Sequence, residues 1–213
     1  MAVDPTTVGL GAVAAAVLGW FVVGTELNLR RGRHLLRWLE EGLPLLGPRT
    51  TLRWLGSSAI ELRVQEALGP LRRAELFIVL EPRDLPVILW WFRHRGRRDL
   101  LIVRGELRDP PRGEFEVIDP RAWSTRNVPA ALQRRGWTAV SMRPDSHWVG
   151  YGPGGSAVGM EVVEIAALPE VVLVRLASHR QAPHIEVQWR LDALHQLKAT
   201  TVLDAFQKVA GRV

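Results

Sequence analysis

Cysteine is absent from the 213-residue sequence, and lysine occurs only at Lys198 and Lys208. The lack of cysteine excludes disulfides, thiolate metal sites and a cysteine nucleophile, and it agrees with a reducing cytoplasm. Almost all of the basic residues are therefore arginine, 26 in number. Together with abundant alanine, glycine and proline, this excess is typical of a GC-rich bacterial genome, so composition accounts for it before mechanism does.

Patterns that mark a catalytic or metal site are also missing. The histidines form no HxxxH or HExxH arrangement, which argues against a metal site. Ser178 and His179 are neighbours in a predicted strand, where adjacent side chains point to opposite faces. The nearby carboxylates Glu114, Glu116 and Asp119 are interpreted as solvent-facing. We therefore predict no catalytic residue, no metal and no cofactor.

One long apolar segment is present. Residues 8–24 carry no charge, and with the flanking threonines they reach about 20 residues, enough to span a hydrocarbon core of roughly 30 Å. A cleaved signal peptide and a buried soluble helix are the alternatives. Asp4 precedes the run without any basic residue, and no small-x-small cleavage site follows before Glu26. The sequence therefore favours a retained transmembrane anchor over residues 1–25.

The basic residues close to this segment all follow it. They are Arg30, Arg31, Arg33 and Arg37. Lys and Arg beside a membrane span are retained on the cytoplasmic side, which predicts an inner-membrane protein with its N-terminus outside and its remaining residues in the cytoplasm. Gly11 and Ala15 have small-xxx-small spacing, so a homodimer through this helix is one possibility.

Residues 26–48 are predicted to form an amphipathic juxtamembrane helix and a linker. The apolar side chains of Leu35, Leu36, Trp38 and Leu39 lie among arginines, a pattern expected at a membrane interface. Gly42, Pro44, Gly47 and Pro48 then end the helix.

The positive charge is concentrated in one part of the chain. Residues 47–143 hold 18 arginines against 11 acidic residues, whereas residues 144–213 hold 6 basic and 7 acidic residues. A basic face held near an anionic leaflet is attracted by about 1 kcal/mol for each residue that comes close. The bilayer, and its anionic headgroups in particular, are therefore candidate partners.

Alternating apolar and polar residues predict an α+β fold built on an antiparallel sheet. A hairpin is expected at 50–64, strands at 75–80, 99–107, 114–118, 137–142, 147–151, 170–178 and 184–190, and helices at 85–94, 128–135, 156–168 and 192–210. A basic module at 49–143 would be followed by a second module at 144–213 packed on it. A shift of 71 residues superposes the two βαββα orders, which is similar to ferredoxin-like modules. A chance coincidence is the alternative to an internal repeat.

The densest basic cluster contains Arg93, Arg95, Arg97 and Arg98, directly after the apolar run Leu85–Phe92. The run is too short for a second span, and we interpret it as a helix buried against the sheet, with Asp84 as its cap. Contact of one of its aromatic side chains with the bilayer surface is the alternative. The arginines fit a solvated turn at a helix end, lipid phosphates, nucleic acid or an acidic protein surface.

A glycine-rich loop at residues 150–156 is the second weak candidate site. Gly152, Gly154, Gly155 and Ser156 stand between a predicted strand and a predicted helix, where backbone N–H groups can bind phosphate. The loop matches no nucleotide-binding motif, because no lysine follows the glycines and Pro153 removes a donor. A simple turn is the competing interpretation.

These observations favour a non-enzymatic, single-pass membrane protein whose cytoplasmic domain contacts a protein partner or the membrane surface. A membrane-bound enzyme or nucleotide sensor that uses the loop at 150–156 is the first alternative. Nucleic-acid binding through Arg93–Arg98 is the second, and we expect it less.

Overall fold

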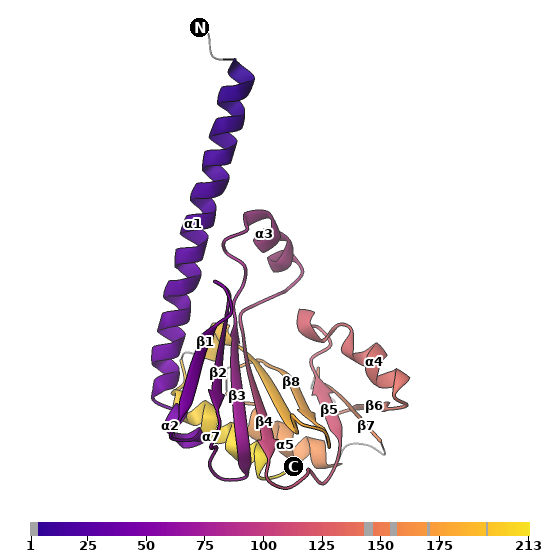
Figure 1. Ribbon diagram of the computed structural model, residues 1–213. Helices are drawn as coiled ribbons and strands as arrows, with labels where there is room; N and C mark the ends of the chain where they lie inside the picture. Colours follow the sequence, from indigo (N-terminus) through magenta and orange to yellow (C-terminus); the bar gives the residue numbers. More distant parts are fainter. Residues whose placement is uncertain (1–3, 143–146, 154–156, 170, 195) are drawn as a thin grey trace.

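The fold is that of a computed structural model that describes residues 4–142, 147–153, 157–169, 171–194 and 196–213 (Figure 1). Nine strands of these residues form one antiparallel sheet in the order β1-β2-β3-β4-β9-β8-β5-β7-β6. The strands are β1 (Thr50–Trp54), β2 (Ala59–Val64), β3 (Leu71–Val79), β4 (Leu100–Leu107), β5 (Phe115–Ile118), β6 (Thr138–Ser141), β7 (Val149–Gly152), β8 (Leu173–Ser178) and β9 (Ile185–Arg190). The α+β class and the large antiparallel sheet are thus confirmed.

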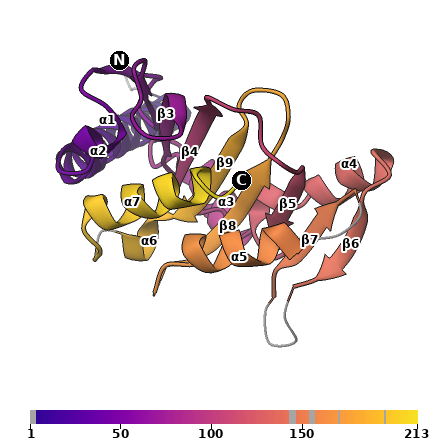
Figure 2. The same cartoon turned by 90° about the horizontal axis from the view of Figure 1, so that it is seen from below.

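The helices of the described residues differ in how they meet this sheet. They are α1 (Pro5–Glu40), α2 (Leu43–Leu46), α3 (Pro86–His94), the 3-10 helix η1 (Trp123–Thr125), α4 (Val128–Arg134), α5 (Ala157–Ala166), α6 (Leu191–Leu194) and α7 (Ala199–Ala210). In Figure 2, α5, α6 and α7 lie together on one side of the sheet. Figure 1 shows α3 apart from them, near the place where α1 leaves the domain.

The core lies between the sheet and helices α5, α6 and α7. Alternate residues of the central strands, among them Val103, Val187 and Trp189, are fully buried, as is Phe206 of α7. Gly105 of β4 allows α7 to pack closely on the sheet, because a side chain at this position would come within 2.6 Å of Leu71 and 3.2 Å of Phe206. The other sheet face carries polar residues such as Arg104, which is paired in register with Glu186.

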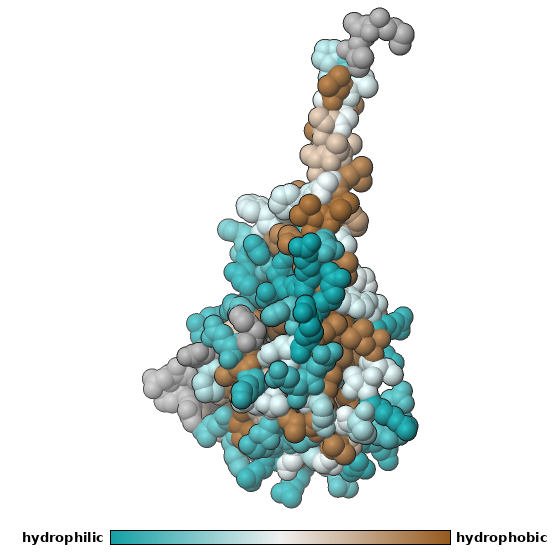
Figure 3. Space-filling view, turned by 90° about the vertical axis from the view of Figure 1, so that its left-hand side faces the viewer, coloured by the Kyte–Doolittle hydropathy of each residue, from teal (hydrophilic) through white to brown (hydrophobic). Residues whose placement is uncertain are grey.

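Helix α1 has two parts with different surroundings. Only 6 % of its most apolar 18-residue window is buried by the rest of the chain, and by length and composition this helix could cross a membrane. Apolar side chains cover the part that projects from the domain (Figure 3). From Gly24 onward, one side of the same helix packs on the domain, where Asn28 and Leu39 are completely buried.

The interfacial prediction for residues 26–41 is wrong for its apolar side. Leu35 and Leu39 belong to the domain core together with Leu46 of α2. A side chain at Gly32 would come within 2.6 Å of Trp54 in β1, so α1 lies close against the first hairpin. The apolar stripe at 35–39 therefore joins the anchor helix to the fold, and residues 43–46 of the predicted linker form α2.

The predicted helix at 192–210 is broken into α6 and α7. The carbonyl of Leu197 accepts a hydrogen bond from Trp38 Nε1 at 2.8 Å, and Lys198 has an extended backbone. Trp38 of α1 is thus bonded to a carbonyl at the break between these helices. The expected apolar face of the second helix is confirmed, since Val202, Phe206 and Val209 are fully buried.

The two predicted modules contribute strands to the same sheet. Residues 49–143 supply β1–β6 and residues 144–213 supply β7–β9, with β9 between β4 and β8. The 71-residue shift does place α3 on α5 and α4 on the start of α7. The strand pairings of the two modules are not equivalent, however. The shift places β4 on β8 and β5 on β9, and β8 pairs with β9, whereas β4 pairs with β3 and β9 and not with β5. The ferredoxin-like repeat stays a prediction.

Candidate functional site

The loop from Glu81 to Leu85 fixes the position of α3 beside α1. Trp20 Nε1 donates a 3.0 Å hydrogen bond to the carbonyl of Arg83. A side chain at Gly24 would lie 2.2 Å from that same carbonyl oxygen, so only glycine allows the loop to approach α1 so closely. The contact lies at the C-terminal end of the uncharged run 8–24. Helix α3 therefore begins at the level where the apolar part of α1 ends.

Two buried carboxylates hold this junction together. Asp99 is 5 % exposed and accepts hydrogen bonds from Arg31 of α1 at 2.6 Å, from Arg83 at 3.0 Å and from the Glu81 backbone N–H at 2.7 Å. Glu81 is 3 % exposed and accepts a 2.9 Å hydrogen bond from Arg93. Because these contacts join α1, the loop and the end of α3, they fix the direction of α3 relative to the anchor helix.

Helix α3 presents its apolar residues to the outside, so the prediction that it is buried against the sheet is wrong. None of its nine residues, all of which the structure describes, is buried. Val87 is 77 % exposed and Trp90 69 % exposed, and Trp91 lies on the same side of the helix. Leu85 and Ile88 are also exposed. Phe92 faces the domain, 5.5 Å from the ring of Trp123.

The beginning of α3 also differs from expectation. Leu85 takes the N-cap position and makes no capping hydrogen bond through its side chain. Asp84, the predicted cap, instead accepts a 2.9 Å hydrogen bond from Ser57 Oγ of the β1–β2 turn. The acidic side chain therefore connects the loop to the first hairpin.

The arginines predicted to bind an anionic surface have different surroundings. Arg30 and Arg33 pair with the exposed Glu26, Arg31 with Asp99, and Arg93 with Glu81. Arg37 Nε lies 3.5 Å from the carbonyl of Arg33.

The arginines that follow α3 contact aromatic rings and backbone carbonyls. Arg95 stacks over Trp91, and Arg97 stacks over Phe92 and Trp123. Arg98 donates to the carbonyls of Arg93 and Arg97. Binding of lipid or nucleic acid by these residues stays a prediction.

A second polar network occupies the sheet face opposite the core. Glu116 of β5 is 3 % exposed, so the prediction that it faces solvent is wrong. It lies 2.8 Å from Arg175 and 3.1 Å from His179 Nε2. Burial alone would raise the pKa of Glu116, but the hydrogen bond from His179 and the charge of Arg175 outweigh burial and lower it. Because Glu186 pairs with both Arg175 and Arg104, this network joins neighbouring strands.

A metal site and the glycine-rich loop at 150–156 concern residues of which the structure describes only a part. Among the described residues, no cluster of three His, Asp or Glu side chains could hold a metal ion. Gly150 and Gly152 belong to β7, where Gly152 pairs with Thr138 of β6. Gly154, Gly155 and Ser156 lie outside the described residues, so the phosphate-binding prediction for this loop stays a prediction.

Sequence reasoning missed one of the two features that define the junction and offered the other only as an alternative. The burial of Asp99 and Glu81 depends on long-range contacts with Arg31 and Arg83, which no local pattern indicates. Contact of one α3 aromatic with the bilayer surface was the alternative to a buried helix, and Trp90 and Trp91 carry that signal, since an amphipathic helix rich in tryptophan is typical of membrane interfaces. No protein-family model and no curated protein sequence matches the chain.

Proposed function

We propose that this is a single-pass membrane protein whose α+β domain lies against the membrane surface and acts there without catalysis. One observation carries the proposal: the apolar face of α3 is exposed beside the point where the apolar part of α1 ends. A soluble domain gains nothing from exposing two tryptophans and a valine, whereas tryptophan is enriched at the boundary of a bilayer.

The geometry supports contact of α3 with the bilayer rather than with water. If residues 5–24 span the hydrocarbon core, Trp20 lies at its edge, and the loop bonded to Trp20 leads directly into α3. The helix would then lie in the headgroup region with Val87, Trp90 and Trp91 toward the acyl chains. Its end carries Arg93 and Arg95, which suit the anionic side of that region.

The energies are sufficient for stable contact. Each large apolar side chain that is fully removed from water contributes about 1.5–3 kcal/mol, and α3 exposes four of them, namely Val87, Ile88, Trp90 and Trp91. Since α1 already holds the domain at the membrane, the insertion of α3 costs little additional translational freedom. Partial insertion of this helix would therefore keep the domain in one orientation.

The arginines that flank the proposed span support one side of the membrane for the domain. Arg30, Arg31, Arg33 and Arg37 follow the apolar run, and the positive-inside rule then favours a cytoplasmic domain. The inner membrane of a bacterium is the location that agrees with this orientation and with the composition. Protein partners and a homodimer through Gly11 and Ala15 are compatible with the arrangement.

A fluorescent label on α3 tests the proposal. The chain has no cysteine, so Val87→Cys can be labelled at one site with an environment-sensitive nitrobenzoxadiazole group. In proteoliposomes, the emission of this label should lie to the blue of the emission of the same group in water. Lipids that carry a quencher in the acyl chain should quench it. The matched label at Asp109→Cys, in the exposed loop after β4, should remain in water.

A second pair of variants identifies the side chains responsible. Trp90→Ser in the Val87→Cys background should weaken the quenching, because the largest exposed ring of α3 is lost. Leu68→Ser removes an exposed apolar side chain at the opposite end of the sheet and should change nothing. A label at position 87 that is as accessible to water as the label at position 109 would overturn the proposal.

A further inference from the structure

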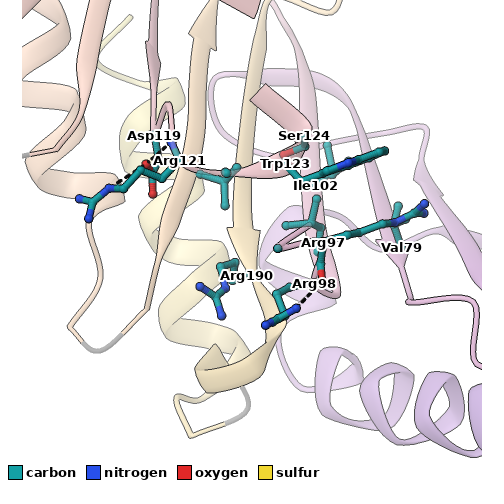
Figure 4. A pocket seen from close by; sticks show the side chains of 13 residues that line it. Val79, Arg97, Arg98, Ile102, Asp119, Arg121, Trp123, Ser124 and Arg190 are labelled. Carbon is teal, nitrogen blue, oxygen red and sulfur yellow. Dashed lines mark hydrogen bonds and ion pairs between the residues drawn. The ribbon is translucent and has the colours of Figure 1, made fainter. Parts of the chain in front are cut away.

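A pocket of about 390 Å³ lies next to α3, between two loops and the adjacent ends of four strands, β3, β4, β8 and β9. The loop before β4 supplies Arg97 and Arg98, and the loop after β5 supplies Arg121 and Trp123. Apolar residues of the strands also line it, among them Ile102 of β4, labelled in Figure 4. Val174 of β8 is another apolar lining residue. The volume is in the range of small-molecule sites.

The lining is strongly cationic. Arginines from three separate segments border the pocket, namely Arg97, Arg98, Arg121 and Arg190, against Asp119 as the acidic residue of the lining. Asp119 is itself engaged, since its carboxylate lies 3.6 Å from Arg121 and 3.4 Å from His147 Nε2. Outside the lining, Glu81 lies 3.9 Å from Arg98 and Asp192 pairs with Arg190, so the excess of positive charge is centred on Arg97.

Arg97 is the most unusual of these residues. Among the described residues, no carboxylate forms an ion pair with it within 4.0 Å; its guanidinium lies 4.5 Å from the ring centre of Phe92 and 5.1 Å from that of Trp123. Burial lowers the pKa of Arg97, although the more distant Glu81 and Asp99 act to raise it. A partly buried cation held in place by two aromatic rings is available to an anionic ligand.

Arg190 and Arg98 provide further donors. Arg190 at the end of β9 is paired in register with Leu100 of β4, so Arg98 enters the pocket from the neighbouring strand end. The Arg190 Nε atom is buried and has no hydrogen-bond partner, while the terminal nitrogen pairs with Asp192. A buried donor without a partner is costly, and an oxygen from a ligand would satisfy it once ligand binding turns this guanidinium toward the pocket.

We infer that this pocket binds the phosphate group of a ligand. Arginine donates paired hydrogen bonds in a planar fork that matches phosphate oxygens, and the Ser124 hydroxyl adds a small donor to the lining. The apolar lining residues and Trp123 would contact the carbon part of the ligand. The phosphate belongs either to the headgroup of a membrane lipid or to a soluble phosphorylated compound.

The lipid source rests on the proposed function, because only a domain held at the bilayer by α3 brings the pocket to the headgroups. The binding chemistry does not depend on it. A soluble compound would reach the same arginines from the aqueous side.

The test uses the full-length chain and two probes. In an uncharged detergent, sn-glycerol 3-phosphate is titrated by calorimetry; in nanodiscs, retention of phosphatidylglycerol over phosphatidylcholine is measured by native mass spectrometry. At least one probe should bind the unaltered protein. Arg97→Gln and, separately, Arg190→Gln should each weaken that binding by about tenfold, because each removes charge-assisted hydrogen bonds.

Arg180→Gln is the control, because it removes the same charge from an exposed position. Arg180 lies in the β8–β9 turn, at the other end of the sheet, so binding of the probes should not change. Retention of the lipid alone would identify the headgroup as the source, and binding of glycerol phosphate would identify a soluble ligand. Failure of both probes, or equal binding by all variants, would overturn the inference. The label at position 87 separates this failure from failure of the proposed function, since its quenching does not require Arg97.

Discussion

At the scale of single residues, Asp99 connects α1 to the domain. It accepts hydrogen bonds from side chains on α1 and on the loop before α3, and it also bonds a backbone N–H. Arg83, one of its partners, is itself largely buried. Loss of the carboxylate would therefore leave a cation without its main partner in a poorly hydrated position.

Asp99→Asn is expected to lower the free energy of unfolding by about 3 kcal/mol, because breaking a buried ion pair leaves its partner uncompensated. Guanidinium denaturation of the full chain in an uncharged detergent measures the change. The exposed Asp109→Asn gives the reference and should alter stability by less than about 0.5 kcal/mol. Equal values for the two variants would contradict the role given to Asp99.

Glu116 makes stability depend on pH in a defined direction. Its pKa is lower in the folded protein than the ordinary value of 4.5, so its contribution is present at neutral pH and is lost as the pH falls through the lowered pKa. Glu116→Gln should therefore be less stable than the unaltered protein at pH 7, and the gap should narrow below 4.5. Thermal unfolding across this range measures the gap, with the exposed Glu66→Gln as control; a gap constant with pH would refute the assignment.

At the scale of elements, local patterns predicted most strands but not the surroundings of every helix. Alternation along residues 50–64 gives the first hairpin, because one face of β2 is buried. The same reasoning failed for α3, since an apolar run with proline in its first turn fits a core helix as well as an interfacial one. Placement of β9 between β4 and β8 was also outside reach, because it depends on pairing between residues far apart in the sequence.

The arginine-lined pocket could likewise be predicted from the sequence only in part. The sequence indicated Arg97 and Arg98 as candidate anion ligands because they lie in a dense basic cluster. It gave no reason to join them with Arg190, which reaches the pocket only through the pairing of β4 with β9. Trp123 was missed for the same reason, as its contact with Phe92 links two distant segments.

The contact between α1 and the loop before α3 gives a prediction at this scale. Gly24→Ala should lower the free energy of unfolding by about 1–3 kcal/mol, because the added carbon would lie 2.2 Å from the Arg83 carbonyl. Gly19→Ala is the matched control, with no atom within 4 Å of the added carbon. The account fails here if Gly24→Ala is as stable as Gly19→Ala in thermal unfolding of the full chain.

At the scale of the whole molecule, α1 and the domain form a continuous unit. Helix α1 runs from the apolar segment into the core without a break, and the Asp99 contacts and α3 are found where it enters the domain. The domain is therefore not suspended on a flexible tether. If α1 spans a membrane as proposed, the same contacts that stabilise the fold would set the orientation of the domain at the bilayer.

The arginines that follow the proposed span predict which side of the membrane carries the C-terminus. A reporter fused after Val213 should be active when it is a fluorescent protein that matures only in the cytoplasm, and inactive when it is a periplasmic phosphatase, because the arginines after the span favour the cytoplasm. Expression of both fusions in a bacterial host, with matched amounts of protein, gives the result. The reverse pattern would invert the proposed topology.

The central claim is that α3 lies in the membrane interface, and a spin-label scan of residues 86–94 in proteoliposomes tests it most directly. Single cysteines are introduced along the helix, and collision rates with oxygen and with a water-soluble nickel complex are compared. The account predicts high oxygen and low nickel accessibility at positions 87, 90 and 91, with helical periodicity. Nickel accessibility at these positions equal to that of a label at position 109 would contradict it.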